Sequence, residues 1–338
     1  MMTIENDITE LLNIKFPMIM APMFLVSNEG MLKAAMDNGI MGAFPSLNYR
    51  KDVELTTILN NLNEYKRTPP IKSGSYGINL IVQKTNIYYE NHLKICADKK
   101  VPFYITSLGN PKEVIDAAHS YGAKVFCDVI NLKHAEKAAS VSCDGFIAVG
   151  QGAGGHAGPY PLHILIPALK RNFPHIPVIA SGGIANGYGI ASVMMAGASG
   201  ISIGTRFIAS DEAKVSQEYK DAIVNSGMDD IVMSSRISGT PSSIINTPYA
   251  RKIGTKQNFI ERYLSNHRAT KKYFKMLVQL RGMKKLEQAI IPGNYNNLWE
   301  AGQSVEMIND IKPCAEIIKR MIAETEQAIK EFDKGFKI

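Results

Sequence analysis

The chain has 338 residues and a formal net charge of +7; 45% of its residues are hydrophobic and 20% are charged. This composition is typical of a soluble globular protein with one large domain, or with one domain and a smaller inserted one. No apolar run approaches the roughly 20 residues needed to cross a bilayer, and the N-terminus lacks a secretory signal pattern, which predicts a cytoplasmic protein.

Eight short apolar segments predict strands, and segments with helical spacing lie between them. In chain order the predicted strands are PMIMA (17–21), IMGAF (40–44), YGINLI (76–81), PFYITS (102–107), AKVFCD (123–128), DGFIAVG (144–150), PVIAS (177–181) and GISIG (200–204). Their starts lie about 20 to 35 residues apart, which is the length of one strand–helix unit with its loops.

The helical segments carry start and stop signals. Asn28 precedes EGMLKAAMDN, which ends at Gly39, and Asn110 and Pro111 open a segment that ends at Gly122. Caps of these types are favoured at helix ends. The later helical segments are NLKHAEKAAS, PLHILIPALKRN, NGYGIASVMMAG and DEAKVSQEYKDAIV.

Eight strands that alternate with helices predict an α/β fold with a parallel sheet covered by helices. Eight is also the number of strands that closes a barrel. A doubly wound open sheet is the competing arrangement, but it usually has a nucleotide fingerprint after its first strand. Here the glycine-rich turns follow strands six, seven and eight, which favours the barrel.

Beyond residue 225 this rhythm stops. MSSRISGTPSSIINTPYARK is rich in turn residues, helical segments are expected from about 257 to 290, IPGNYNNLWEAGQS follows as a loop, and a long helix ends the chain. We therefore predict a barrel (1–225), a mostly helical subdomain over one end of the barrel (226–305) and a C-terminal helix packed on the outer ring (306–338).

Positive charge is concentrated between Arg251 and Lys285. A nucleic-acid surface, a solvated helix face and a surface that attracts an anionic substrate or carrier are the three interpretations. Because the sequence contains no recognisable nucleic-acid-binding module, we expect no nucleic-acid partner. Because no apolar run is long enough to cross a bilayer, we also expect no membrane partner. The four cysteines lack metal-ligand spacing and are interpreted as buried apolar residues.

In α/β barrels the active site lies at the carboxyl ends of the strands, and the unusual residues of this chain fall there. In order, these are Ala21, Pro22 and Met23 after strand one, Asn79 in strand three, Asp128 at the end of strand five, the loop GQGAGGHAGP (150–159) after strand six, Ser181, Gly182 and Gly183 after strand seven, and Gly204, Thr205 and Arg206 after strand eight.

The turns after strands seven and eight predict a phosphate site, because barrels often bind phosphate there through backbone N–H groups. Tight turns without a ligand are the alternative. His156 lies on the glycine loop at the same rim, where an imidazole can donate a hydrogen bond or carry a proton. No second ligand stands at metal-binding spacing from it, so we expect no metal.

Five motifs together resemble the nitronate monooxygenases, formerly called 2-nitropropane dioxygenases. They are APM (21–23), GINL (77–80), AGGHAG (153–158), PVIASGGIANG (177–187) and GASGISIGTRF (197–207), and WEAGQ (299–303) resembles a late family element. The same superfamily contains FMN-dependent enoyl-acyl-carrier-protein reductases and NADH:quinone reductases. The resemblance runs in order over residues 14–225.

The resemblance implies a TIM barrel that binds FMN without a covalent link. Ala21, Pro22 and Met23 would pass beneath the isoalloxazine, Asn79 would bond to its edge, and His156 would lie near its reactive face. The phosphate would lie against Ser181, Gly182, Gly183, Gly204 and Thr205. The loop glycines would let the chain approach the flat ring closely.

Two positions depart from the pattern of the relatives. Gly152 stands where many relatives have glutamate, and Asp128 stands where some quinone reductases have a lysine near the flavin. A lysine there would favour an anionic reduced flavin more strongly than Asp128 does.

The leading hypothesis is a nitronate monooxygenase that oxidises a small nitronate with O2 to a carbonyl compound and nitrite. The alternative is an NAD(P)H-dependent flavin reductase acting on a quinone or an enoyl thioester. A third hypothesis is a binding protein without catalysis, which the presence of His156 and both phosphate turns disfavours. The sequence leaves the oligomeric state open, with a homodimer as the candidate assembly.

Overall fold

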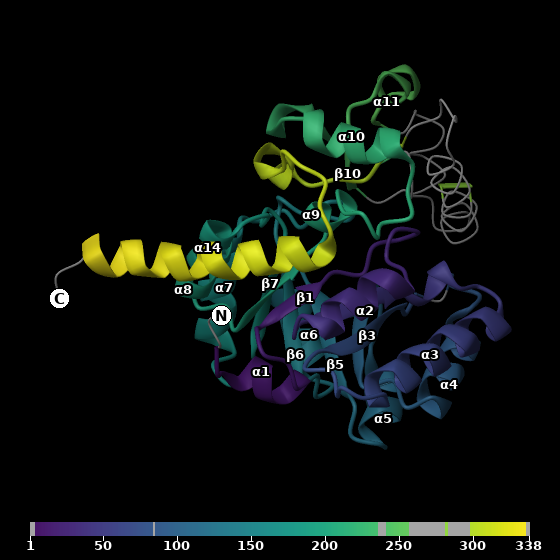
Figure 1. Ribbon diagram of the computed structural model, residues 1–338. Coiled ribbons are helices and arrows are strands. Elements are labelled where there is room, and N and C mark those ends of the chain that lie inside the picture. Colours follow the sequence, from purple (N-terminus) through teal and green to yellow (C-terminus); the bar gives the residue numbers. More distant parts are fainter. Residues whose placement is uncertain (1–3, 84, 236–240, 257–280, 283–297, 336–338) are drawn as a thin grey trace.

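The computed structural model describes residues 4–83, 85–235, 241–256, 281–282 and 298–335. Its centre is a closed barrel of eight parallel strands in chain order, in which β1 pairs with both β2 and β8 (Figure 1). The strands are β1 (Met18–Met20), β2 (Met41–Pro45), β3 (Ser75–Ile81), β4 (Phe103–Ser107), β5 (Lys124–Val129), β6 (Gly145–Val149), β7 (Val178–Ser181) and β8 (Gly200–Ile203). The closed sheet confirms the predicted TIM barrel and its eight strands.

Most of the helices surround the barrel, while α1 lies at one end of it and α10 and α11 lie beyond the other end (Figure 1). The helices are α1 (Asp7–Leu12), α2 (Glu29–Asp37), α3 (Asp52–Arg67), α4 (Tyr89–Asp98), α5 (Lys112–His119), α6 (Leu132–Ala139), α7 (Leu162–Asn172), α8 (Gly187–Met195), α9 (Thr205–Ile208), α10 (Gln217–Asn225), α11 (Pro248–Ile253) and α14 (Cys314–Gly335), with 3₁₀ turns η1 (Ser46–Asn48), η2 (Met228–Asp230) and η3 (Gln303–Met307). Across these described segments, no helix has both the length and the apolar character needed to span a bilayer.

The barrel interior is filled by alternate strand residues, because successive side chains of a strand point to opposite faces. Ile19, Phe103, Phe126 and Ile179 belong to this inner cluster. Helix α1 closes the amino-terminal end of the barrel, where its Ile8 joins the same cluster. The opposite, carboxyl-terminal end of the barrel is therefore the end left for a ligand.

The predicted helix over DEAKVSQEYKDAIV begins later than expected, at Gln217. The Ser216 side chain accepts a hydrogen bond from Tyr219 N and caps the helix there. The preceding residues bind the C-terminal helix instead: the Glu212 carboxylate accepts a hydrogen bond of 2.8 Å from Cys314 N at the start of α14. Asp211–Ser216 thus forms a connection that fixes α14.

The C-terminal helix α14 lies across α8 and α2 on the outside of the barrel (Figure 1). Gly187 explains how α8 and α14 approach so closely, because a Cβ atom on Gly187 would stand 2.1 Å from Thr325 N. All four cysteines are buried and unbridged, as the composition predicted.

Two short strands lie in and beside the segment that is rich in turn residues. β9 (Ile231–Ser234) and β10 (Ser242–Ile245) pair antiparallel, and neither strand was predicted from the sequence. Their side chains gain partners from elsewhere in the chain: Ile244 of β10 packs with Leu298 and Ala250. The helical segments expected from about 257 to 290 lie outside the described residues, apart from 281–282, and the three-part division of the chain stays a prediction.

Candidate active site

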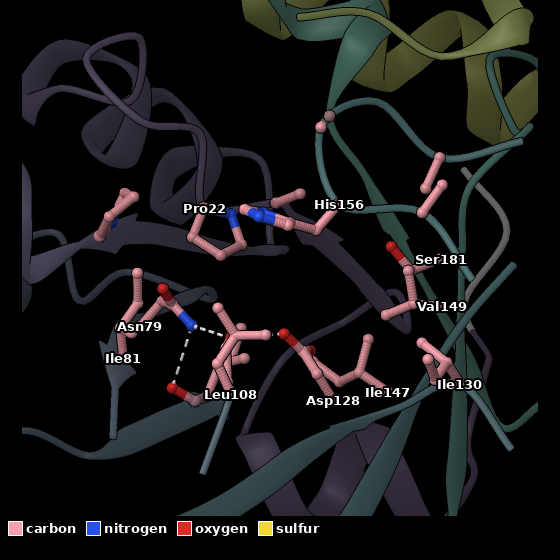
Figure 2. Close-up of a pocket in the computed structure, with 18 of the residues that line it drawn as sticks. Pro22, Asn79, Ile81, Leu108, Asp128, Ile130, Ile147, Val149, His156 and Ser181 are labelled. Carbon is pink, nitrogen blue, oxygen red and sulfur yellow. Dashed lines mark hydrogen bonds between the residues drawn. The ribbon is translucent and has the colours of Figure 1, made fainter. Parts of the chain in front are cut away.

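A cavity of about 1340 Å³ opens at the carboxyl ends of the strands. Every site residue predicted from the sequence lines it: Ala21, Pro22, Met23, Asn79, Asp128, His156, Ser181, Gly182, Gly183, Gly204 and Thr205. Figure 2 shows the His156 ring pointing across the cavity toward Pro22, with Asn79 and Asp128 along another side. The topology therefore brings together residues that are scattered over much of the sequence.

The wall after β1 is held in a fixed shape by side-chain hydrogen bonds. Ser27 Oγ accepts from Met23 N at 2.9 Å and donates to Ala21 O at 3.2 Å. Asn48 Nδ2 donates to Met23 O at 3.3 Å. A wall constrained in this way presents Pro22 and Met23 as a preformed apolar surface, which suits a flat aromatic ring.

The glycines of the loop after β6 are needed where main chain meets main chain. A Cβ atom on Gly152 would stand 2.9 Å from Gly183 Cα, one on Gly154 2.9 Å from Ala301 C, and one on Gly158 2.1 Å from Val149 O. The loop is thus packed against the turn after β7 and against residue 301. This contact explains the departure at Gly152, since a glutamate there requires a wider spacing of the two loops.

The turn after β7 has the bare backbone of an anion cradle. Gly182 has a φ of +106°, and a Cβ atom on it would stand 2.7 Å from Ala153 N. Gly183 also has a positive φ, and its N–H donates to Gly152 O at 3.0 Å. Gly183 therefore contributes open space to the cavity. Its N–H group already donates to Gly152 O and is not available to a ligand.

A second part of the cradle follows β8. Thr205 Oγ1 accepts a hydrogen bond of 3.0 Å from Gly302 N, which leaves the hydroxyl proton of Thr205 to be donated. Next to it, Arg206 is 1% exposed and donates to Asp310 Oδ1 at 2.6 Å. Asp310 also binds Arg320, so two guanidinium groups share one carboxylate and the cluster keeps a net positive charge.

The Thr205 hydroxyl proton, the open backbone at Gly182 and Gly183 and the nearby positive cluster fit a phosphate, and with it the FMN that the sequence implies. The sequence places Arg206 in the turn after β8 but does not indicate a role for it. Its position directly after Gly204 and Thr205 was the feature of the sequence that could have indicated a role near the phosphate. We expect its buried charge to favour an anion on the Thr205 side of the cavity.

Asn79 and Asp128 are linked through Ser107, which the sequence analysis missed. Ser107 Oγ accepts from Asn79 Nδ2 at 2.8 Å and donates to Asp128 Oδ2 at 2.5 Å. Burial raises the pKa of Asp128 to about 6, although the hydrogen bond from Ser107 acts in the opposite direction. Ser107 ends β4, and its place at the carboxyl end of a strand was a signal for a site residue.

Replacing Asp128 with asparagine should change how stability depends on pH. The folded protein holds the Asp128 proton up to a pH of about 6, whereas the unfolded chain releases it near pH 4. The stabilisation from protonation is therefore fully present below about pH 4 and is lost as the pH rises through about 6. Over this window, wild type should lose about 2–3 kcal/mol of unfolding free energy relative to Asp128→Asn.

Urea unfolding of the FMN-free protein and of this variant at several pH values measures the difference. A difference in unfolding free energy that stays constant between pH 4 and pH 7 would contradict the burial of this carboxyl group.

The His156 side chain is exposed to the cavity, and the surrounding walls still remove part of its solvent. This desolvation lowers the pKa of His156 from its ordinary value. The imidazole is therefore neutral at neutral pH, and it can donate one hydrogen bond and accept another.

Two further residues of the cavity were not predicted, and both come from beyond the barrel strands. Glu300 and Tyr219 line it, and Tyr219 Oη donates to Glu300 O at 2.5 Å. Burial raises the pKa of Glu300 to about 7. Glu300 belongs to the WEAGQ motif, so the sequence singled out its segment without indicating a role for the carboxyl group.

Comparison with known proteins gives consistent results. Residues 54–324 match the nitronate monooxygenase family. A (3aS,4S,5R,7aS)-5-hydroxy-7a-methyl-1-oxo-octahydro-1H-indene-4-carboxyl-CoA dehydrogenase from Rhodococcus jostii (strain RHA1) is 24% identical, over 98% of each chain. A probable nitronate monooxygenase from Staphylococcus saprophyticus is 25% identical, over 96% of this chain and 99% of the relative.

Among solved structures, FabK from Thermotoga maritima superposes with a TM-score of 0.83 and 28% identity, over 99% of this chain and 100% of FabK. The barrel, the cavity at its carboxyl end and the family match over most of the chain agree with one another. The chain is an oxidoreductase that belongs to the nitronate monooxygenase family of flavoproteins.

Proposed function

We propose that the chain is an FMN-dependent oxidoreductase that uses NAD(P)H to reduce the carbon–carbon double bond of an acyl thioester carried by a large group such as coenzyme A. The observation that carries this proposal is the charge of the cavity. Among its described lining residues the carboxyl groups are Asp128 and Glu300, and Lys137 is the one lysine or arginine.

This charge pattern suits a neutral reacting group better than a small anion. An alkyl nitronate is an anion, and buried anions are paired with cations or several hydrogen-bond donors. An enoyl thioester is neutral at its reacting atoms and needs only a hydrogen bond to its carbonyl oxygen. His156 can donate that bond while uncharged.

The size of the cavity supports the same proposal. Pockets for single ligands usually measure about 300–1,000 Å³, and this cavity of about 1340 Å³ is larger. There is room for FMN and for an extended second ligand together. The Rhodococcus jostii relative is named for a carboxyl-CoA substrate, which belongs to the proposed class of carrier-bound acyl groups.

In this proposal the protein positions the reactants and handles the protons. The turns after β7 and β8, with Thr205 and the nearby Arg206 cluster, would hold the FMN phosphate. Ala21, Pro22 and Met23 would support the ring, and Asn79 would bond to its edge. When bound, FMN supplies the hydride that NAD(P)H provides. His156 would orient the thioester carbonyl and stabilise charge that develops on its oxygen.

Nitronate oxidation with O2 is the second candidate function, because residues 54–324 match the family named for it. His156 would then bind the nitronate oxygen, or remove the α-proton from a neutral nitroalkane. In this case the two carboxyl groups of the cavity have to be protonated or shielded by the flavin.

Anaerobic stopped-flow absorbance distinguishes the two functions. The FMN-loaded protein is mixed separately with NADH, NADPH and propyl-2-nitronate, and the reduced protein is then mixed with trans-2-octenoyl-CoA, a quinone or O2. The proposal predicts fast bleaching of the flavin by a nicotinamide and fast recovery with the enoyl thioester. Bleaching by the nitronate alone would establish the second candidate and overturn the first.

A further inference from the structure

Glu300 is held in the cavity by a framework outside the barrel. Tyr219 Oη donates to its main-chain oxygen, and the Tyr219 ring stacks on Trp299 with an interplanar angle of 6°. Glu300 also forms a bridge with Ile244 of β10. A residue fixed on both sides in this way is positioned, unlike an exposed glutamate on a loose loop.

The same framework ties Glu300 to the loop that carries His156. Ser243 N donates to Gly155 O at 2.7 Å, and Ser243 O accepts from both Gly155 N and Ala301 N, at 3.2 and 3.3 Å. The neighbours of His156 and Glu300 are therefore bonded to one residue of β10. β10 holds the two functional segments in a fixed relation.

The Glu300 carboxyl group lies directly against Gly155. A Cβ atom on Gly155 would stand 3.3 Å from Oε2 and 3.6 Å from Oε1. Gly155 also has a positive φ of +65°. A larger residue here would therefore be strained in its backbone and would also crowd the Glu300 carboxyl group. The glycine before His156 thus leaves the space that the carboxyl group occupies.

The surroundings keep this carboxyl group close to its point of titration. Within the described ranges, no lysine or arginine pairs with Glu300, and burial is the cause that raises its pKa to about 7. Tyr219, whose pKa is raised by burial, bonds to the main chain of Glu300, and His156, whose pKa is lowered by desolvation, lines the same cavity. Near neutral pH the His156 and Tyr219 side chains are uncharged, while Glu300 itself passes between its protonated and its ionised form.

We propose that Glu300 is the proton donor of the reaction, a catalytic carboxylic acid that delivers a proton to the substrate carbon next to the thioester carbonyl. This inference rests on the proposed reduction of an enoyl thioester. His156 would bond to the carbonyl oxygen, which separates the polarising group from the acid.

The β-carbon receives hydride, with both electrons, originally from the nicotinamide dinucleotide. The α-carbon takes the proton of Glu300 as the carbon–carbon double bond becomes single. The Glu300 carboxylate is then reprotonated by water, and the products are the saturated thioester and oxidised nicotinamide.

Glu300→Gln tests the proposal, because glutamine keeps the shape and cannot donate a proton of this kind. The reduced variant should pass electrons to trans-2-octenoyl-CoA about 10 to 100 times more slowly than wild type. Its reduction by NAD(P)H and its affinity for FMN should stay within about twofold. The wild-type rate should fall as the pH rises through about 7, and the variant should lose this dependence. Glu316→Gln, on the exposed side of α14, is the matched control.

Failure of the proposed function and failure of the role of Glu300 give different results. A wild type that transfers no electrons to enoyl thioesters overturns the proposed function. A wild type that does so, together with a Glu300→Gln variant of equal rate and equal pH profile, overturns the role of Glu300 alone.

Infrared spectroscopy tests the titration of Glu300 without substrate, so it applies even if the variant turns over poorly for another reason. Infrared difference spectra of the FMN-loaded protein, taken on either side of neutral pH, should show a carboxylic-acid C=O band that Glu300→Gln removes. Asp128→Asn, which removes the band titrating near pH 6, identifies the other carboxyl group of the cavity. A spectrum unchanged by Glu300→Gln would overturn the proposal.

Discussion

His156→Ala is expected to lower turnover by about 100-fold or more while FMN stays bound. A positioned acid–base or hydrogen-bonding side chain typically contributes about 10²- to 10⁴-fold to a rate. His156 lines the cavity at the carboxyl end of the barrel, and partial desolvation by the cavity walls lowers its pKa, so its ring is neutral at neutral pH. The measurements are steady-state turnover and FMN fluorescence on the purified variant.

His175→Ala is the matched control, because His175 is exposed in the turn that leads from α7 into β7, at the other end of the barrel. It should keep wild-type turnover. A His156→Ala protein that loses FMN but has unaltered turnover per bound flavin would show that His156 acts only on cofactor binding.

Gly182→Ala is expected to weaken FMN binding by about 100-fold. The left-handed backbone costs an alanine roughly 1–2 kcal/mol, and the new methyl group would stand 2.7 Å from Ala153 N. Overpacking of this kind costs about 1–3 kcal/mol. To relieve it, the turn after β7 has to move away from the loop after β6, and the phosphate cradle opens. Fluorescence titration of the FMN-free protein measures the affinity.

Gly189→Ala provides the comparison for this effect, because Gly189 lies in α8 and a Cβ atom there would meet its nearest neighbour at 3.5 Å. Alanine is the better helix former by about 1 kcal/mol, so this variant should bind FMN normally and be at least as stable. Equal FMN affinity in Gly182→Ala and Gly189→Ala would place the phosphate away from the turn after β7.

The barrel was predictable because its signals are local and repeated. Each strand is a short apolar run with turn residues around it, and Asn28 and Asn186 cap the helices that follow two of them. The site residues were predictable for a related reason: in a parallel barrel all carboxyl ends of the strands meet at one rim. For this reason His156, in the loop after β6, and Asp128, in β5, are expected in one cavity although each strand is predicted from its own local sequence.

The rest depended on contacts between distant parts of the chain. β10 has no apolar alternation of its own. It forms because Ser243 bonds to Gly155 and Ala301 and because Ile245 N donates to Trp299 O. Ser107 joins the site only through its bonds to Asn79 and Asp128. The glycines around His156 predicted a close approach to a flat ring. They did not reveal that main chain packs against Gly183 and Ala301, because these residues are distant in the sequence.

We expect the cavity at the carboxyl end of the barrel to bind FMN with its phosphate at the turns after β7 and β8. A crystal structure of the protein grown with FMN would show this. The phosphate should lie against Ser181–Gly183 and Gly204–Thr205, the ring beside Ala21–Met23, and His156 near the exposed face of the ring. A flavin bound elsewhere, or a cavity that stays without FMN at saturating concentration, would contradict this expectation.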